Sequence, residues 1–422
     1  MSDLLESWLH KLELRHPKAI DLGLERCSMV YRELGSPAPA PMVFTVGGTN
    51  GKGSVVAYLT AILSALDYRC GSYTSPHILQ FNERVCIDGV NATSGQFVSA
   101  FEKVELARRD ISLTYFEFTS LAAFQIMNDQ AIDVAILEVG LGGRLDTVNL
   151  IDADCVVITP IGLDHQDYLG SDRESIGREK AGIIRAGIPV ICGDRNPPSS
   201  IVTRSDELGA RLLRLGTDFK RSVQDNLLHL SIGQDRFVVS RPEMKGNHQL
   251  DNLATAITAV HALMPDHLAR DNKWKSAAQW VQLPGRLCAH TPDPRFLLDV
   301  GHNPMAASVV SDYLREFSQG QVICILGMLA DKDATGVVEE MANVVDHWYC
   351  AGLPGSRGQN GEDLAVKVAA GDSDALKTVF ENVGDAIKAA KHIAGDNDLV
   401  LVFGSFETVA AAMRVLAATA GT

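Results

Sequence analysis

Apolar runs of strand length recur along the chain, and each is followed by glycine and then by apolar positions at helical spacing. In the first two thirds these runs are residues 42–48, 133–143, 154–162 and 188–194. Helix-like segments lie among them, at about residues 54–66, 118–130 and 174–187. This alternation predicts an α/β fold, with a mostly parallel sheet covered by helices on both faces.

The same alternation begins again after about residue 290, in residues 295–304, 321–333, 346–352 and 398–413. The intervening "WVQLPGRLCAHTPDP" contains the proline and glycine typical of a junction. We therefore predict two domains, 1–287 and 288–422, of which the second is smaller. Residues 213–241 alternate loosely, and we interpret them as an antiparallel hairpin at the edge of the first domain.

Composition narrows the class of protein. The chain has 422 residues, 46% of them hydrophobic, and a formal net charge of −14. Such acidity disfavours non-specific nucleic-acid binding, which needs basic patches. The eight cysteines form no C-x-x-C pair, which indicates reduced thiols rather than a zinc site. The N-terminal segment does not look like a signal peptide, and no apolar run approaches the ~18 residues of a membrane span. We predict a cytoplasmic protein without membrane or nucleic-acid partners, and a monomer by default.

The stretch "TVGGTNGKGSVVAYLTAIL", residues 45–63, has the order strand, glycine-rich loop and helix. Glycines let several backbone N–H groups point at an anion, and the helix that follows adds its positive end. Lys52 would offset the charge of the β- and γ-phosphates, and the Ser54 hydroxyl would bind magnesium. The spelling departs from G-x-x-x-x-G-K-[ST], because the first glycine lies one residue too near Lys52 and Gly53 separates Lys52 from Ser54. We still interpret the stretch as a phosphate-binding loop.

Other polar residues follow the predicted strands, where parallel sheets bind their ligands. Glu138 ends one strand and is a natural magnesium ligand. His165 follows the next strand and is a candidate metal or phosphate contact. In the second domain Asp299 ends a strand, and His302 lies in the turn before a helix that should start at Pro304. Lys180, by composition alone, would be an exposed lysine on a helix.

Seven motifs taken together resemble the Mur ligase superfamily and, within it, the folylpolyglutamate synthase family. The motifs are "TVGGTNGKGS", "SYTSPHI", "LEVGLGGRLDTVN", "LDHQDYLG", "REKAGI", "LPGR" and "LLDVGHNP". They stand in the family's order, and the resemblance runs from about residue 20 to 409. The resemblance is especially strong to the bacterial bifunctional members of the family, which act as both dihydrofolate synthase and folylpolyglutamate synthase.

The resemblance implies an N-terminal P-loop ATPase domain, a C-terminal Rossmann-like domain and an ATP-dependent amide ligase. ATP would convert a substrate carboxylate to an acyl phosphate, which the amino group of L-glutamate then attacks. The cofactors implied are ATP, two magnesium ions and an optional monovalent cation. The residues assigned to ATP by position are Thr49, Asn50, Gly51, Lys52, Gly53, Ser54, Asn252, Arg286 and Asp299. ATP would then contact residues of both domains.

The same resemblance assigns the catalytic, metal and acceptor-substrate residues. The metal set is Ser54, Ser75, Glu138 and His165. Lys52, Glu138, His165, His302 and a carboxylated Lys180 would act in catalysis; a bare amine at Lys180 in the ATP-bound form would contradict the last assignment. The stretches assigned to dihydropteroate are Asp21, Leu22 and Gly23; Thr114, Tyr115, Phe116 and Glu117; and Leu145, Asp146 and Thr147. In these stretches Phe116 would stack on an aromatic ring of the substrate, and Asp21 would accept hydrogen bonds from its ring N–H groups.

Three alternatives stay open at this point. A peptidoglycan Mur ligase uses the same chemistry, but its additional N-terminal domain has no room before a loop that begins near residue 47. A P-loop switch or kinase would lack glutamate-dependent turnover. A folylpolyglutamate synthase without dihydrofolate synthase activity is the hardest to separate, because both reactions use the same ATP and glutamate.

Overall fold

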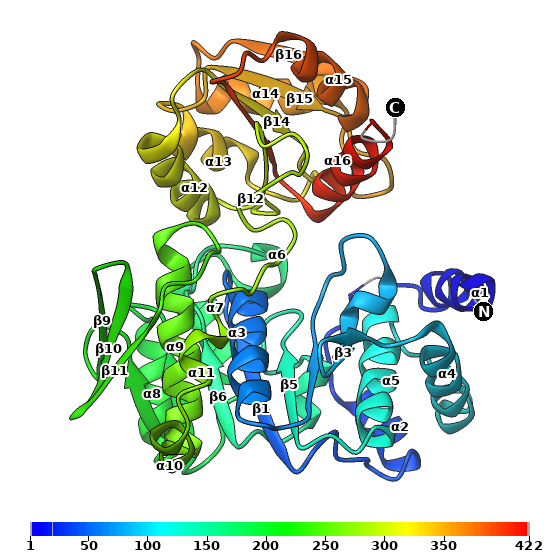
Figure 1. Cartoon of the computed structure of the whole chain (residues 1–422). Coiled ribbons are helices and arrows are strands. Elements are labelled where there is room, and N and C mark those ends of the chain that lie inside the picture. Colours follow the sequence, from blue (N-terminus) through cyan, green and yellow to red (C-terminus); the bar gives the residue numbers. More distant parts are fainter. Residues whose placement is uncertain (1, 19, 420–422) are drawn as a thin grey trace. The chain divides into compact units, whose positions relative to one another are not determined.

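The computed structural model describes residues 2–18 and 20–419, which form two compact units (Figure 1). The first unit contains the residues up to 161 together with 166–242 and 250–281. The second contains 162–165, 243–249 and the chain from 282 onward. The domain limits 1–287 and 288–422 stay a prediction.

The first unit is built on an eight-stranded sheet with the order β4-β3-β2-β5-β1-β6-β7-β8. Its strands are β1 (Met42–Gly47), β2 (Cys70–Tyr73), β3 (Val85–Ile87), β4 (Val90–Asn91), β5 (Val134–Glu138), β6 (Cys155–Ile158), β7 (Pro189–Cys192) and β8 (Arg211–Arg214). All neighbouring pairs are parallel except β2–β3 and β3–β4. The predicted α/β fold with a mostly parallel sheet is confirmed.

Helices cover both faces of this sheet, because successive side chains of a buried strand point to opposite sides. The helices are α1 (Ser2–Glu13), α2 (Glu25–Glu33), α3 (Lys52–Ala65), α4 (Ser94–Arg108), α5 (Tyr115–Asp129), α6 (Gln166–Leu169), α7 (Arg173–Ala181), α8 (Ser199–Glu207), α9 (Asn247–Leu263), α10 (Pro265–Arg270) and α11 (Trp274–Ala277), with 3-10 turns η1 (Phe81–Arg84) and η2 (Thr147–Leu150). On one face, Val43, Leu137 and Val156 join a core with residues of α1, α2, α4 and α5. Helix α3 packs against β1, β2 and β5 (Figure 1).

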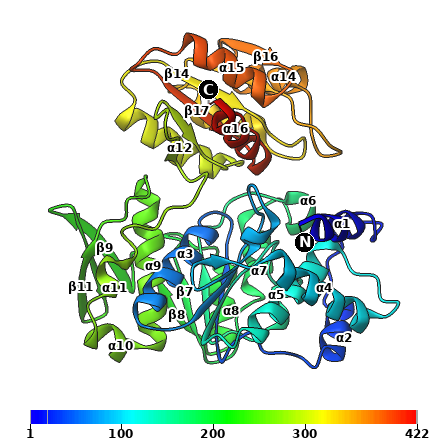
Figure 2. The ribbon, with the colours of Figure 1, turned by 45° about the vertical axis from the view of Figure 1, so that its right-hand side comes forward.

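Residues 219–240 form three antiparallel strands rather than the predicted hairpin. The strands β9 (Phe219–Gln224), β10 (Leu227–Ile232) and β11 (Asp235–Ser240) make a separate sheet with the order β11-β10-β9. Figure 2 shows this sheet beside α9 and α11. The antiparallel pairing is confirmed, but the number of strands was wrong, because two tight turns, at Asp225–Asn226 and at Gly233, divide the segment into three strands.

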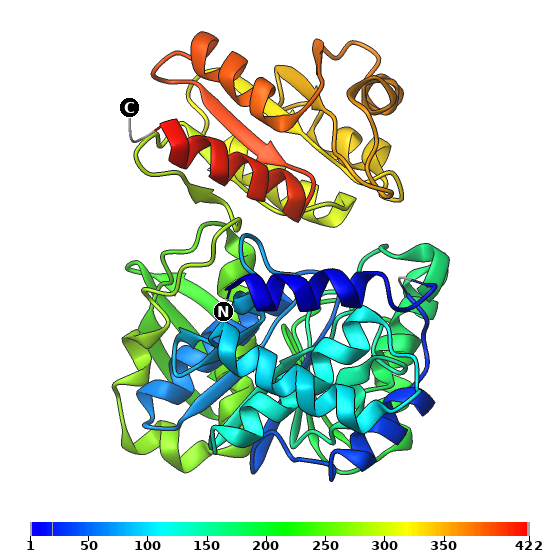
Figure 3. The ribbon, with the colours of Figure 1, turned by 90° about the vertical axis from the view of Figure 1, so that its right-hand side faces the viewer.

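The second unit contains a six-stranded sheet with the order β12-β13-β17-β14-β15-β16, in which β12 alone of these strands is antiparallel. Its strands are β12 (Cys288–Ala289), β13 (Phe296–Leu298), β14 (Val322–Leu326), β15 (His347–Ala351), β16 (Lys377–Phe380) and β17 (Leu399–Phe403). Its helices are α12 (Pro304–Phe317), α13 (Ala334–Met341), α14 (Gly361–Gly371), α15 (Val383–Ile393) and α16 (Phe406–Thr419). Helices α12, α13 and α14 share one core with alternate residues of β14, while α16 packs along β17 (Figure 3).

Candidate active site

The glycine-rich loop lies between the end of β1 and the start of α3, at the centre of the first sheet. Gly48 has a φ of +138°, and a Cβ there would lie 1.9 Å from Thr159 Oγ1, so the loop passes against the end of β6. Gly51 has a φ of +91° and precedes α3, which begins at Lys52, two residues earlier than predicted. The positive end of a 14-residue helix therefore faces the loop, as anion binding requires.

Asn252 on α9 packs directly against this loop. A Cβ on Gly51 would lie 2.7 Å from Asn252 Oδ1, closer than such contacts allow. Asn252 itself is buried and has little room to retreat. The structure thus places beside the loop a residue that only the resemblance had assigned to ATP.

Replacement of Gly51 by alanine is expected to destabilise the protein and to weaken ATP binding. The change introduces both an unfavourable positive φ and a clash with Asn252, together costing about 3 kcal/mol. Gly89→Ala is a matched control, because Gly89 has a φ of +81° and nothing within 4 Å of its added Cβ, so only about 1 kcal/mol is expected. Urea unfolding of both variants measures the difference; equal losses would contradict the packing of Asn252 against the loop.

Two lysines converge on one carbonyl of the loop. Lys52 Nζ donates to Gly48 O at 3.2 Å and to Thr49 O at 3.1 Å. Lys180 Nζ, on α7, donates to Gly48 O at 2.7 Å. Lys180 is only 4% exposed, so the composition-based expectation of an exposed lysine was wrong. The Gly48 carbonyl is therefore contacted by Lys52, which the loop motif indicated, and by Lys180, which only the family resemblance had assigned to the site.

Glycines allow α7 to come this close. A Cβ on Gly143 would lie 3.1 Å from Lys180 Cα, and a Cβ on Gly182 would lie 2.6 Å from Arg144 Cα. Arg144 also donates to Glu179 Oε1 at 2.9 Å, which holds α7 against the turn after β5. This packing buries Lys180, because side chains larger than glycine at positions 143 and 182 would push α7 away.

Glu138 ends β5, as predicted, and lies beside Ser75. The Ser75 N–H donates to Glu138 Oε2 at 3.3 Å, and Glu138 is 6% exposed. Carboxylate and hydroxyl oxygens are the donors that magnesium prefers. Glu138 and Ser75 carry these donor types, although the contact between them is made by the Ser75 backbone N–H. In the described ranges, no cluster of three or more His, Cys, Asp or Glu side chains has the arrangement of a metal site. The predicted metal set is Ser54, Ser75, Glu138 and His165. Only two of these residues are of the types that form such a cluster.

His165 belongs to the short segment 162–165 that groups with the second unit. Its φ is +52°, and its Nε2 lies 3.5 Å from Lys332 Nζ. Lys332 also donates to Asp164 Oδ1 at 2.6 Å, and His302 Nε2 lies 3.3 Å from Asp164 Oδ2. Burial opposes ionisation of Asp164, but the hydrogen bond and charge of His302, with His165 and Lys332, hold its carboxyl pKa well below the usual range. Asp164 and Lys332 were not predicted as site residues.

Asp299 follows β13 and is buried in the second unit. Its carboxylate accepts from the Leu287 N–H at 2.9 Å and from the Gly301 N–H at 2.7 Å. Burial raises the pKa of Asp299, while the nearby charge of Arg286 opposes that shift. Arg286 groups with this second unit and lies over the Phe406 ring at 5.4 Å.

The three stretches assigned to dihydropteroate lie together in the first unit. Glu117 Oε1 accepts from Arg26 Nη2 at 2.8 Å, and Arg26 Nη1 lies 2.7 Å from Asp21 Oδ2. A Cβ on Gly140 would lie 2.5 Å from Phe116 Cζ and 3.2 Å from Asp146 Oδ2. Residues from near 21, 116 and 146 are therefore neighbours, although no short-range pattern relates them.

Two residues that were not singled out from the sequence hold this region together. Arg26 bridges Asp21 and Glu117, and the Cys27 thiol donates to Glu117 Oε1 at 3.0 Å and lies 3.6 Å from Thr147 Oγ1. Burial and the Glu117 charge raise the Cys27 pKa, so this thiol stays protonated. Both carboxylate oxygens of Glu117 are thus occupied, since Oε2 accepts from the Thr114 N–H at 2.7 Å. Glu117 and Thr114 shape the region rather than present open acceptors.

Asp146 is a buried carboxylate whose protonation should make stability depend on pH. It accepts from the Leu141 and Val148 N–H groups at 2.8 and 2.9 Å, yet burial raises its pKa from 3.8 to about 6. Between pH 4 and 6 the folded state therefore holds a proton that the unfolded state has released, and stability falls as pH rises, by up to about 3 kcal/mol.

The expected result is that Asp146→Asn removes this part of the pH dependence. The free energy of unfolding of the wild type, relative to Asp146→Asn, should decrease from pH 4 to pH 6. Denaturant unfolding at several pH values measures it. A wild type whose relative stability rises over that range would contradict a raised pKa.

Comparison with known proteins places the chain in a family. The Mur ligase middle-domain model matches residues 46–260, and the Mur ligase glutamate-ligase-domain model matches residues 285–406. The dihydrofolate synthase/folylpolyglutamate synthase of Escherichia coli strain K12 is 43% identical over 419 residues, covering 98% of this chain and 95% of that protein. The chain is a Mur ligase of the dihydrofolate synthase/folylpolyglutamate synthase family. The resemblance read from the seven motifs is confirmed.

Solved structures of this family agree with the fold. Escherichia coli FolC in complex with DHPP and ADP superposes with a TM-score of 0.93 at 42% identity, covering 99% of this chain and 98% of that one. A bifunctional folylpolyglutamate synthase/dihydrofolate synthase with Mn, AMPPNP and L-glutamate bound superposes with a TM-score of 0.88 at 41% identity, covering 98% of each chain. The two-domain α/β architecture of these Mur ligases is therefore shared by this chain.

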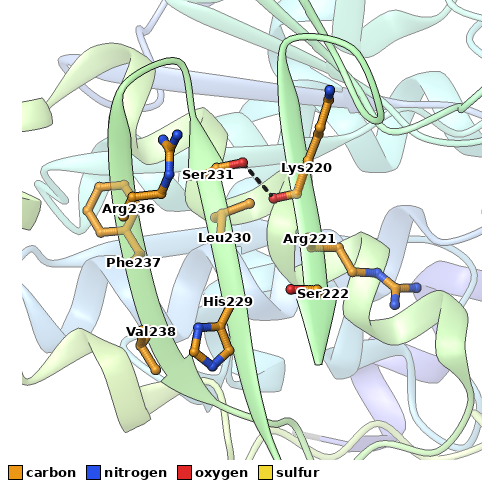
Figure 4. A pocket seen from close by; sticks show the side chains of 9 residues that line it. All are labelled: Lys220, Arg221, Ser222, His229, Leu230, Ser231, Arg236, Phe237 and Val238. Atoms are coloured by element: carbon orange, nitrogen blue, oxygen red, sulfur yellow. Dashed lines mark hydrogen bonds between the residues drawn. The ribbon is translucent and has the colours of Figure 1, made fainter. Parts of the chain in front are cut away.

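A separate pocket of about 300 Å³ lies on the three-stranded sheet (Figure 4). It is lined by Lys220, Arg221, Ser222, His229, Leu230, Ser231, Arg236, Phe237 and Val238. None of these residues belongs to the sets predicted for ATP, metal or dihydropteroate. Arg221 nevertheless donates to Asp251 Oδ1 at 2.9 Å, next to Asn252, so this sheet braces the helix that packs on the phosphate loop.

Proposed function

We propose that this Mur ligase couples ATP hydrolysis to the addition of L-glutamate to dihydropteroate, giving dihydrofolate, and to the terminal glutamate of reduced folates, giving folylpolyglutamates. The observation that carries the proposal is the glycine loop with Lys52, Lys180 and Asn252 gathered on it. Its relatives with both activities, matched over 98% of the chain, support it.

The chemistry follows from the poor reactivity of a carboxylate. A carboxylate oxygen of the acceptor attacks the γ-phosphorus of ATP, the bond to the β-phosphate oxygen breaks, and ADP leaves. The glutamate amine then attacks the acyl carbon of the acyl phosphate, phosphate leaves, and the amine gives up a proton. Lys52 and the N-terminus of α3 offset the negative charge of the transferring group. Thr49, Asn50, Gly51, Gly53 and Ser54 are proposed to bind the phosphates, and Asn252, Arg286 and Asp299 to bind the rest of the nucleotide.

The Glu138 carboxylate, at the end of β5, is of the donor type that a divalent metal takes. We assign Ser54, Ser75, Glu138 and His165 to magnesium, with two ions and an optional monovalent cation as the finer proposal. When bound, magnesium neutralises the phosphate oxygens during transfer. His302 is proposed to act near the phosphates through its contact with Asp164.

Lys180 is proposed to carry a carboxyl group formed with carbon dioxide. The Lys180 amine attacks carbon dioxide and releases one proton, which leaves a carbamate with one N–H and two oxygen donors. The remaining N–H can still donate to Gly48 O, as Nζ does in the structure. Its burial, at 4% exposure, fits a side chain whose end is held in one position beside the loop.

The acceptor would bind along the three stretches that converge on Arg26, Glu117 and Asp146. We propose that Phe116 stacks on an aromatic ring of dihydropteroate. Leu22, Gly23, Tyr115, Leu145 and Thr147 complete the proposed surface. The Asp21 carboxylate is already paired with Arg26, so it would accept from the substrate through the oxygen atoms that remain accessible.

Assay of ADP release tests the function. Purified protein is supplied with ATP, magnesium and L-glutamate, together with either dihydropteroate or a tetrahydrofolate. Glutamate-dependent release with both acceptors is the expected result, whereas release with the folate alone would reduce the function to folylpolyglutamate synthase. Turnover that needs no glutamate would favour a kinase or switch instead.

Location and assembly stay predictions. In the part of the chain that the structure describes, no helix combines the length and apolar character of a membrane span. A cytoplasmic location and a monomeric state are what we propose for this enzyme, with small-molecule partners.

A further inference from the structure

Arg84 ends η1 and is the one arginine among the described residues that is buried, at 8% exposure. Its guanidinium lies over the Phe81 ring at 5.3 Å and over the Tyr115 ring at 5.5 Å. Its Nε donates to His77 Nδ1 at 3.0 Å. A permanent positive charge is therefore held between two aromatic rings and a histidine.

No Asp or Glu of the described residues lies within ion-pair distance of this guanidinium. More exposed arginines of the same unit are paired: Arg26 with Glu117, and both Arg15 and Arg108 with Glu105. A buried charge is costly unless it is paired, so an unpaired Arg84 needs a partner from elsewhere.

The neighbouring carboxylate is committed to the backbone. Glu83 accepts from the N–H groups of Ile78, Leu79 and Gln80 at 2.8, 2.9 and 2.7 Å. These bonds turn Glu83 toward the loop 77–80. Glu83 is therefore bound to backbone N–H groups of its own loop and is not a partner for Arg84. The Arg84 guanidinium stays available to another group.

The two Nη nitrogens of Arg84 are the groups that a partner would reach. Neither donates to an acceptor in the described part of the chain, and neither is among the sealed polar atoms that lack a partner. Arg84 is buried as a whole, but these two nitrogens are not completely closed off from solvent. Two parallel N–H donors in a desolvated setting are the geometry that binds a carboxylate through both oxygens.

The surroundings connect Arg84 to the proposed acceptor surface. Tyr115 belongs to that surface, and burial raises its pKa to about 12 despite the opposing charge of Arg84. Tyr73 also feels the Arg84 charge, and its ring lies 6.3 Å from the Phe116 ring. The anion that reaches Arg84 should therefore be part of the molecule that lies against Tyr115 and Phe116.

We propose that Arg84 binds a carboxylate of the acceptor substrate. The proposal rests on the proposed function, since it takes the acceptor to be dihydropteroate or a folate. Two sources share this chemistry: the carboxylate that becomes phosphorylated, present in both acceptors, and the α-carboxylate of the terminal glutamate, present only in folates. The aromatic walls exclude water from the pair and strengthen it.

Binding of pteroate and of its neutral primary amide tests the proposal directly. We expect wild type to bind pteroate at least about 10-fold more tightly than the amide. Arg84→Met should weaken pteroate binding by about 10- to 100-fold and change amide binding by less than about 3-fold. Titration calorimetry measures both ligands, independently of turnover. Equal binding of the two ligands by wild type would exclude the reacting carboxylate as the partner of Arg84. If Arg84→Met then also binds a tetrahydrofolate as tightly as wild type does, the proposal is overturned.

Kinetics with the two acceptors separate the sources. A raised KM for both dihydropteroate and tetrahydrofolate identifies the reacting carboxylate, and a raised KM for the folate alone identifies the α-carboxylate. Unchanged KM values for both, or a rise confined to L-glutamate, would overturn the proposal even if wild type shows the proposed activity. If wild type shows no turnover, the proposed function fails while the calorimetry still decides the binding by Arg84.

Control variants distinguish a loss of carboxylate binding from a loss of the folded structure. Arg108→Met removes a guanidinium that has its own carboxylate, and Glu105 keeps its bond to Arg15, so KM values should not change. If Arg84→Met does not fold, Arg84→Lys retains the charge and the apolar stem; it should fold and bind pteroate with intermediate affinity. The comparison of pteroate with its amide on wild type needs no variant at all.

Discussion

Lys52→Met is expected to reduce the turnover number by about 10³-fold or more while leaving the protein folded. Lys52 hydrogen-bonds the Gly48 and Thr49 carbonyls, so its ammonium lies where the phosphates would enter the loop. In the transition state the Lys52 ammonium would bind phosphate oxygens, which become more negative, in place of the neutral carbonyl oxygens. The interaction is therefore stronger in the transition state than in the free enzyme, and its loss lowers the rate rather than stability.

The measurement is glutamate-dependent ADP release, with thermal unfolding to confirm the fold. Methionine preserves the length and apolar character of the stem, so a loss reports the charge. Lys103→Met is the matched control, because Lys103 is exposed and pairs with Asp129 at 2.7 Å on the surface. The control should keep wild-type turnover. A Lys52→Met enzyme within tenfold of wild type would mean that the loop does not bind the transferring phosphate.

Lys180→Met is expected to lower the turnover number by about 10²-fold to 10³-fold. Lys180 Nζ donates to Gly48 O at 2.7 Å from a buried position, so no bulk water can replace it. The variant loses either an ammonium or, as we propose, a carbamate that supplies oxygen donors to a metal. Carbon dioxide distinguishes the two, because only the carbamate depends on it.

We expect wild type to lose activity when carbon dioxide is removed by degassing and to regain it with added bicarbonate. Peptide mass measurement under non-acidic conditions should show the mass of one carbon dioxide on Lys180. Lys180→Met should not respond to bicarbonate, and Lys103→Met should respond as wild type does. Activity of wild type that is indifferent to carbon dioxide, with an unmodified Lys180, would show that the ammonium itself acts on the loop.

The local features of the site could be predicted from the sequence. Glu138 ends β5, Asp299 follows β13 and α12 starts at Pro304, as the pattern of apolar and polar positions indicated. These positions depend on strand and helix propensities that act over a few residues. The glycine loop was recognisable despite its unusual spelling, because its backbone requirements are also local.

Features that depend on packing between distant segments could not be predicted. Lys180 and Gly48 are 132 residues apart in the sequence, and Arg26 and Glu117 are 91 apart. Composition predicted an exposed Lys180, because a nine-residue helix with five charged residues looks like a surface helix. Its burial depends on Gly143 and Gly182, whose close contacts appear only when the chain is folded.

The sequence by itself determined the α/β fold, the family and the position of the phosphate loop, because each is encoded in short patterns of apolar residues, glycine and charge. The tertiary structure decided which groups face that loop and which charges are left unpaired. It brought Lys180 and Asn252 to Gly48 and Gly51, and it left Arg84 buried without a carboxylate. The physical reason is that burial and pairing of a charge depend on all of its neighbours in space, whereas a motif records only its neighbours along the chain.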